Sequence, residues 1–432
     1  MNFIFFSLVA VSFLFAGWRE LSWTPAMGDI TPMAALSKAM VESATGAVEL
    51  AIGLVGVMTL FLGLVKVAEA GGMLTILARL IRPIMVRLFP EVPPDHPAMG
   101  SMILNLSANA LGLGNAATPF GIRAMQELDS LNPHKGTATN AMALFLAINT
   151  SSVTLLPTGV IALRAAAGST DPAGILSTTL FATIGSTSVA ILTAFLYRRF
   201  SPLPIAEDGG EIKKFDYTPV SEDIDTAYPD AGAGYPSWIG FAAICGLICA
   251  IPLAVVYGKT ISPWILPAIM IGFLLFGMIQ RVRVYEVFVD GAKEGFQVAL
   301  KIIPYLVAIL VAVGMFRASG GMDTLVGWLG IWTKKVGIPP EALPMALMRP
   351  LSGSGAYGIL ASLINDPAIG PDSYTGYLVS TLQGSTETTF YVLAVYFGAV
   401  QVRRVRHTLA VALTADLAGL IFSVIACLYI VG

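Results

Sequence analysis

The chain has 432 residues, of which 56% are hydrophobic and only 12% are charged, and its formal net charge is −2. Soluble domains carry about 25% charged residues. The low charge, together with a mean hydropathy of +0.77, therefore excludes an ordinary soluble protein and predicts an all-α polytopic membrane protein. No basic tract is present, so nucleic acid is not an expected partner.

Apolar stretches of about the 20 residues that cross a bilayer recur along the chain. Residues 1–17 have no basic flank and no small-residue cleavage site, so we predict a retained first span rather than a signal peptide. The predicted spans are 2–18, 47–68, 140–163, 174–197, 237–257, 262–280, 296–316, 376–400 and 408–431.

Two further stretches, 97–121 and 342–364, are apolar enough for the membrane but unusually rich in Gly, Asn and Ser. Irregular backbone is tolerated at membrane depth only where it is buried in protein or lines a cavity. We therefore predict that each stretch is a broken helix or a re-entrant hairpin.

The chain divides into two halves, 1–199 and 237–432, joined by an acidic linker at 200–236. Short motifs recur in both halves in the same order, beginning with AGGM at 70–73 and SGGM at 319–322. We predict a duplication in which each half is one transmembrane repeat. An odd number of predicted crossings separates the repeats, so the second is inverted, as in many secondary transporters. Clusters of Lys and Arg after alternate spans place the linker in the cytoplasm.

One acidic residue, Glu387, lies in the middle of a predicted span. A carboxylate at that depth costs several kcal/mol unless it faces protein or water. Ligand binding, cation binding and proton transfer are candidate roles. A structural ion pair with Arg349 is the alternative, and both readings hold if the pair breaks during transport. Asp416, in the last span, is a weaker candidate.

Polar groups of the interrupted segments form the candidate site, because broken helices expose termini that hold a polar solute or a cation. For the cluster at 149–152, helix–helix hydrogen bonding is an equal alternative. Glu387 and Arg349 are also candidates for coupling or gating. We predict no catalytic residue, no metal and no cofactor. The candidate substrate-binding residues are Asn105, Ser107, Asn109, Asn115, Thr118, Asn149, Thr150, Ser151, Ser352, Ser354, Gln383, Ser385, Thr386 and Glu387.

Several long motifs carry a family resemblance. LNLSANALGLGNAATPFG (104–121) resembles spore maturation protein A, and LMRPLSGSGAYGIL (347–360) and LQGSTETTFYVLAVYFGAV (382–400) resemble spore maturation protein B. The chain thus resembles a natural fusion of the two, within the group that carries the nucleoside-recognition or Gate domain, which includes concentrative nucleoside transporters. The resemblance implies Gate-type repeats. The 384–388 run is similar to the Gln-Thr-Glu hairpin tip of those transporters, where the acid contacts nucleoside, but the Ala-Pro that follows there is missing here.

These observations predict a secondary transporter of a small polar organic solute, multi-pass in the inner (cytoplasmic) membrane, with its site at the repeat interface. Coupling to H⁺ or Na⁺ is left open, and so is whether 323–336 faces lipid or a second copy in a homo-oligomer. The alternatives are a nucleoside transporter specifically and a non-transporting membrane factor in spore maturation. An intramembrane hydrolase is disfavoured, because no histidine falls in a predicted span to activate a serine.

Overall fold

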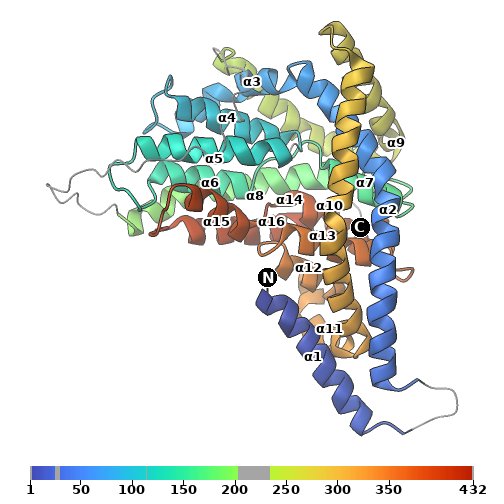
Figure 1. Ribbon diagram of the computed structural model, residues 1–432. Coiled ribbons are helices and arrows are strands. Elements are labelled where there is room, and N and C mark those ends of the chain that lie inside the picture. Colours follow the sequence, from blue (N-terminus) through green and yellow to red (C-terminus); the bar gives the residue numbers. More distant parts are fainter. Residues whose placement is uncertain (1, 25–29, 113, 203–233, 431–432) are drawn as a thin grey trace.

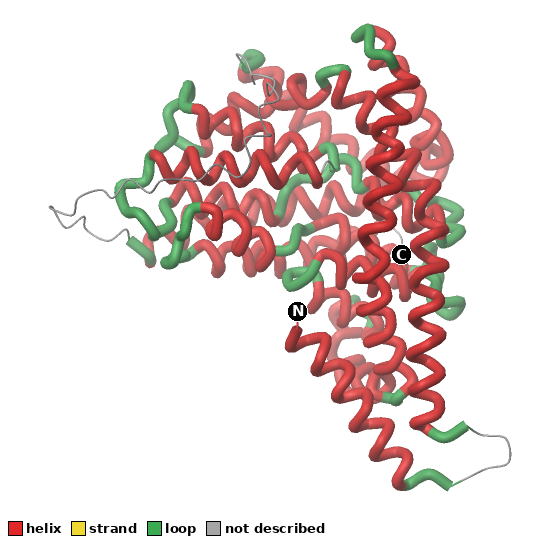
Figure 2. Tube along the Cα trace, in the orientation of Figure 1, coloured by secondary structure: helices red, strands yellow, loops and turns green. Residues whose placement is uncertain are grey.

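The computed structural model describes residues 2–24, 30–112, 114–202 and 234–430, and these residues are almost entirely helical (Figures 1 and 2). Within them the β pairing is limited to an isolated bridge between Thr137 and Arg404. Most of the predicted 200–236 linker lies outside the described residues. The expected all-α class is confirmed.

The described helices divide between the two predicted halves. The first half contains α1 (Asn2–Leu21), α2 (Pro32–Ala70), α3 (Met73–Leu88), α4 (Pro97–Ala110), α5 (Gly114–Ser130), α6 (Asn140–Thr150), α7 (Thr158–Ala166), α8 (Ile175–Tyr197) and η1 (Arg198–Phe200). The second contains α9 (Ser237–Ile279), α10 (Val284–Ala318), α11 (Gly321–Thr333), η3 (Lys334–Val336), η4 (Pro340–Ala342), α12 (Leu343–Met348), α13 (Gly353–Ile364), α14 (Tyr374–Ser385), α15 (Thr389–Ala399) and α16 (Thr408–Ile430).

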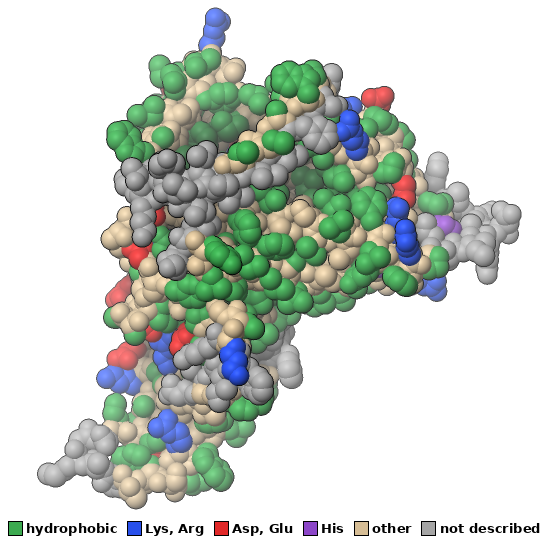
Figure 3. Space-filling model, turned by 180° about the vertical axis from the view of Figure 1, so that it is seen from behind, with side chains coloured by type: hydrophobic (Ala, Val, Ile, Leu, Met, Phe, Trp, Pro, Cys, Tyr) green, Lys and Arg blue, Asp and Glu red, His purple; other side chains and the backbone are tan. Residues whose placement is uncertain are grey.

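Apolar side chains cover broad areas of the surface, and charged side chains lie mainly toward its margins (Figure 3). Among the described residues, three helical stretches are long and apolar enough to cross a membrane, namely Pro32–Ala70, Ile175–Phe200 and Thr408–Tyr429. The chain is therefore an integral membrane protein, and its apolar surface faces lipid.

Four of the predicted spans differ from the structure in their continuity. The spans 237–257 and 262–280, predicted as separate, belong to one helix, α9, because only Gly258 among residues 258–261 favours a turn. The stretches 140–163 and 376–400, predicted as unbroken, are each interrupted, at 151–157 and 386–388. The two predicted irregular stretches are interrupted as expected, between Ala110 and Gly114 and at 349–352.

Helices α2 and α10 form a long antiparallel pair that runs steeply across the other helices in Figure 1. Glycines allow the two backbones to approach: a Cβ added at Gly291 would lie 2.5 Å from the Cβ of Lys66, and one added at Gly295 would lie 2.7 Å from the Met58 carbonyl oxygen. Small residues at such contacts are the usual means of close helix packing in lipid. Lys66 also pairs with Glu294 at 3.2 Å.

Helices of each predicted half pack against helices of the other half. Helix α2 packs against α9 and α10 against α1, while α8 packs against α14 and α16 against α6. Helices α8 and α16, which hold the same place in the two halves, pack extensively on each other. The two predicted halves are therefore intertwined and do not pack as separate units. The duplication and the inverted relation of the repeats stay predictions.

One end of the molecule is fastened by Arg164, whose side chain is completely buried. It donates to the Pro371 carbonyl, to the Asp171 carbonyl at 3.1 Å and to the Asp372 carboxylate at 3.1 Å. Burial acts to raise the pKa of Asp372, but hydrogen bonds from Ser169 and Thr170 and the charge of Arg164 outweigh it, and the pKa lies below its ordinary value. The loop before α14 is thus fixed to the loop after α7.

At the opposite end, the loop before α6 is fixed to the loop after α15 in the same way (Figure 1). The backbone N–H groups of Arg403 and Arg404 donate to the Gly136 carbonyl at 2.9 and 3.0 Å. Arg406 donates to the Ala138 carbonyl at 2.9 Å and to the side chain of Asn140 at 3.1 Å. Each half therefore fastens a loop of the other, once at each end.

We expect Asp372→Asn to lower the melting temperature of the purified protein at neutral pH and to change its pH dependence. Because the folded-state pKa of Asp372 lies below the unfolded value of about 3.9, its contribution is complete above that pH and is lost as the pH falls through the folded pKa. The melting temperatures of wild type and variant should therefore converge between about pH 4 and the lower folded pKa.

Arg164→Met should lower stability further, by about 3 kcal/mol, since it removes the buried partner of the pair. Thermal unfolding in detergent between pH 7 and pH 3 measures both effects. The control is Asp95→Asn, because the side chain of Asp95 is 98% exposed. A constant difference between wild type and Asp372→Asn across this range would contradict the prediction.

Candidate functional site

The chain breaks at 151–157 and 386–388 fall in the most polar parts of their segments, where side chains compete with the helix for its backbone groups. Thr150 and Ser151 both donate to the Ala147 carbonyl, at 3.0 and 2.8 Å, and Pro157 has no N–H to continue the helix. Ser385 likewise donates to the Leu382 carbonyl at 3.2 Å. Sequence analysis identified the polar runs but treated them as parts of unbroken spans.

The interruptions meet one another in space. The N–H of Glu387 donates to the Thr150 carbonyl at 2.7 Å and joins the two breaks directly. The N–H of Leu155 donates to the Ala110 carbonyl at 2.9 Å, and in the second half the N–H of Phe390 donates to the Pro350 carbonyl at 3.1 Å. Backbone groups freed by one interruption are thus satisfied by another, as membrane depth requires.

A buried polar cluster lies beside this junction. Asn149 donates to Asn105, and Asn105 donates to the Ala117 carbonyl at 2.7 Å and to the Tyr396 hydroxyl at 3.2 Å. All three side chains are almost inaccessible. A Cβ added at Gly121 would overlap the Tyr396 hydroxyl, so glycine is what admits this ring. The predicted ligand groups Asn105 and Asn149 are therefore engaged with protein in this conformation.

Tyr396 was missed by sequence analysis. It lies in the apolar helix α15 with no polar neighbour in sequence, and only the packing of α15 against α5 and α6 brings it to Asn105. Sequence analysis also missed a group of polar residues on α8, which their spacing in the sequence could have identified. Thr179, Thr183 and Ser186 recur at helical spacing on α8, and all three are fully buried.

Arg349 and Glu387 lie together as predicted. Arg349 is buried and donates to the Thr386 carbonyl and, at 3.2 Å, to the Thr388 hydroxyl. Its nearest distance to the Glu387 carboxylate is 3.8 Å, and the side chain of Glu387 is 50% exposed. The acid is therefore not sealed in a paired cluster. Its long, half-exposed contact with Arg349 leaves both readings of Glu387, as a ligand-binding group and as a structural partner, in place.

The other predicted site residues differ in whether their polar atoms already have hydrogen-bond partners in the protein. Ser107, Thr150, Ser151 and Ser385 bond within their own helices, and Ser352 caps α13 by accepting from the N–H of Gly355 at 3.0 Å. Ser354 lies 3.5 Å from the Ser352 hydroxyl, and Thr118 is half-buried. The side chain of Asn115 lies outside the described part. Asn109 Nδ2 and Gln383 Oε1 are buried and have no hydrogen-bond partner in the described part of the chain.

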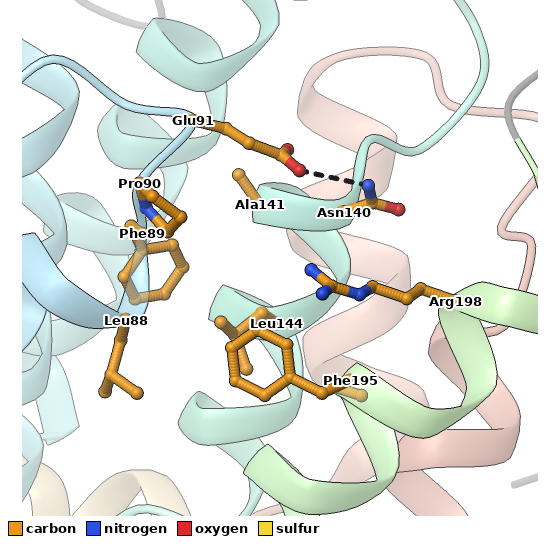
Figure 4. Close-up of a pocket in the computed structure, with 10 residues that line it drawn as sticks. Leu88, Phe89, Pro90, Glu91, Asn140, Ala141, Leu144, Phe195 and Arg198 are labelled. Carbon is orange, nitrogen blue, oxygen red and sulfur yellow. Dashed lines mark hydrogen bonds between the residues drawn. The ribbon is translucent and has the colours of Figure 1, made fainter.

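Two cavities lie away from this junction. One, of 20 Å³, has room for about one water molecule and is lined by Phe89, Leu144, Phe195 and Arg198, with Glu91 bonded to Asn140 at its rim (Figure 4). The other, of about 600 Å³, lies between α2, α10 and α13. Neither is lined by the predicted site residues.

Comparison with known proteins assigns the family. The model of the Gate family, described as nucleoside recognition, matches residues 51–201 and 299–403. The chain belongs to this family. These matched segments include all four interruptions, so the junction is built from the family's own sequence.

Curated relatives match the chain in parts. Spore maturation protein B of Bacillus subtilis is 49% identical over 160 residues, which cover 37% of this chain and 89% of that protein. Spore maturation protein A of the same organism is 45% identical over 166 residues, covering 38% and 85%. The inner membrane protein YjiG of Escherichia coli K12 is 32% identical over 107 residues, covering 24% and 64%. The chain thus has the make-up of a fusion of proteins A and B, as predicted.

Among solved structures, the YdaH transporter of Alcanivorax borkumensis covers 99% of this chain and 98% of its own, with 17% identity and a TM-score of 0.41.

We expect Asn149→Ala to destabilise the protein, because it leaves the carbonyl oxygen of Asn105 without a donor. Hydrogen bonds between membrane helices contribute about 1 kcal/mol each, so the loss should appear as a lower melting temperature in detergent. Tyr396→Phe keeps the ring and removes only the hydroxyl, and it serves as the matched variant with a smaller loss. Unchanged melting of Asn149→Ala would show that the cluster does not hold the breaks together.

Proposed function

We propose that this protein is a secondary transporter of a small polar organic solute and that the solute binds at the junction of the interrupted helices, beside Glu387. The observation that carries the proposal is the meeting of the two breaks through the Glu387–Thr150 hydrogen bond, next to a half-exposed carboxylate and a buried guanidinium. Membership of the nucleoside recognition family and the interrupted helices support a carrier rather than an enzyme.

The chemistry of the junction favours a ligand with hydrogen-bond donors. The Glu387 carboxylate accepts, and the N-termini of α13 and α15 lie close to Arg349, since Thr388 contacts that residue and a Cβ added at Gly353 would lie 2.8 Å from the Thr388 hydroxyl. Helix N-termini and a guanidinium attract anionic or electron-rich groups. A solute that carries both donors and acceptors, such as a nucleoside, nucleobase or amino acid, matches these groups.

The proposed setting is a multi-pass protein of the inner membrane, with the arginines at 403, 404 and 406 at the cytoplasmic end. The name of YjiG as an inner membrane protein supports this location. In this setting the two repeats are inverted, and the solute site lies between them near the middle of the bilayer.

A second candidate is favoured by the names of the relatives. Proteins A and B are spore maturation proteins, so the chain is alternatively a non-transporting membrane factor with a related role. The two readings differ in what they require of Glu387. A factor that acts by assembly tolerates a neutral residue of the same shape, whereas a carrier that uses the carboxylate does not.

We expect Glu387→Gln to reduce solute flux into proteoliposomes by about 10- to 100-fold while the protein stays folded, because a hydrogen bond to a charged group contributes about 1.5–3 kcal/mol. The solute is first chosen from a thermal-shift screen of nucleosides, nucleobases, amino acids and dicarboxylates. Glu91→Gln is the matched control, since Glu91 lies at the rim of the small cavity away from the junction. Wild-type flux in Glu387→Gln, or no solute-dependent stabilisation of the wild type, would count against the carrier.

A further inference from the structure

Asp416, the weaker candidate from the sequence, lies at the same junction, and the proposed solute site gives it no role. It lies on α16, and its Oδ2 accepts from the hydroxyl of Thr389 at 2.7 Å. Thr389 is the first residue of α15, directly after the 386–388 break. The other carboxylate oxygen, Oδ1, is buried and has no hydrogen-bond partner among the described residues.

Few charges act on Asp416. The helices that pack on α16 are chiefly α6, α8, α14 and α15, and none of them contains Asp, Glu, Lys, Arg or His. The charged group that acts on Asp416 is Arg349, which in turn faces Glu387. The remaining titratable groups of these helices and of α16 are Tyr197, Tyr374, Tyr377, Tyr391, Tyr396, Cys427 and Tyr429.

The guanidinium of Arg349 is bonded to groups other than Asp416. Arg349 donates to the Thr386 carbonyl and the Thr388 hydroxyl and faces Glu387 at 3.8 Å, while Asp416 forms none of the ion pairs seen in the described residues. With both acids ionised, two carboxylates share one cation. An ionised carboxylate with a buried, unpaired oxygen is strongly unfavourable. A proton on Oδ1 removes that charge.

We propose that Asp416 is a proton-binding site that alternates with Glu387 as the partner of Arg349, so that the coupling ion is H⁺. This inference rests on the proposed transport function. While Arg349 faces Glu387, Asp416 holds its proton. When solute engages the Glu387 carboxylate, Arg349 is released toward Asp416, the O–H bond of Asp416 breaks, and the proton passes to water. One proton leaves as one solute binds, so the net charge of Arg349, Glu387 and Asp416 changes from zero to −1, and a solute with a cationic donor at Glu387 restores the balance.

The protonation state is tested without knowledge of the solute. Dicyclohexylcarbodiimide attacks protonated carboxyl groups in apolar surroundings, and peptide mass spectrometry locates the adduct. In the full-length protein in lipid nanodiscs we expect labelling of Asp416 at pH 6 and at least a tenfold lower yield at pH 9. Asp129 is the internal control, because it is 1% exposed but paired with Lys135 at 2.8 Å, and it should stay unlabelled.

Arg349→Met should extend the labelling of Asp416 to higher pH, since the cation that favours the ionised form is gone. The labelling of the wild type stands as the primary result if that variant does not fold. An absence of adduct on Asp416 at pH 6 in folded wild type, or labelling equal at pH 6 and pH 9, overturns the proposal.

Transport supplies the second test, with the solute that gives the largest shift in the screen described above. In proteoliposomes, Asp416→Asn should keep solute exchange between the two sides but lose accumulation driven by a pH gradient, whereas Glu387→Gln loses both. Gradient-driven accumulation by Asp416→Asn equal to that of the wild type overturns the proton site and leaves the carrier intact. Labelling of Asp416 as expected, with no wild-type flux of any screened solute, overturns the carrier and leaves the proton site.

Discussion

The structure depends on one constraint, which is that backbone groups freed by a broken helix cannot remain unpaired at membrane depth. In the described part of the chain, four interruptions share backbone hydrogen bonds with one another. The Glu387–Thr150 bond links the breaks of the two halves, and the Leu155–Ala110 and Phe390–Pro350 bonds link each break to the neighbouring interruption. The polar centre is thus held by hydrogen bonds between interruptions, one of which joins the two halves.

The same interdependence is present at the two ends. Arg164 holds the loop before α14, and the 403–406 segment holds the loop before α6, so each half fastens a helix whose far end carries a break. These contacts hold the N-terminal ends of α6 and α14, while the side-chain bonds of Thr150, Ser151 and Ser385 mark their C-terminal ends.

Within the junction, the polar groups have two kinds of role. Asn105, Asn149 and Tyr396 bond one another in a site without solvent access and contribute to holding the helices together. Glu387 is half-exposed, and Arg349 faces it without a close ion pair. The bonded cluster therefore lies beside a longer charge contact in which Glu387 is the exposed partner and Arg349 is held by Thr386 and Thr388.

The sequence by itself determined the membrane class, the family, the polar runs and the central acid, since composition and motif are properties of local sequence. It also predicted the interruptions at 97–121 and 342–364, where Gly, Asn and Ser are dense. It did not determine that α6–α7 and α14–α15 are broken, because a run of Ser and Thr is compatible with a helix until a partner accepts its backbone groups. The contact of Tyr396 with Asn105 and the contact of Asp416 with Thr389 depend on tertiary structure alone, because the two residues of each contact lie on different helices.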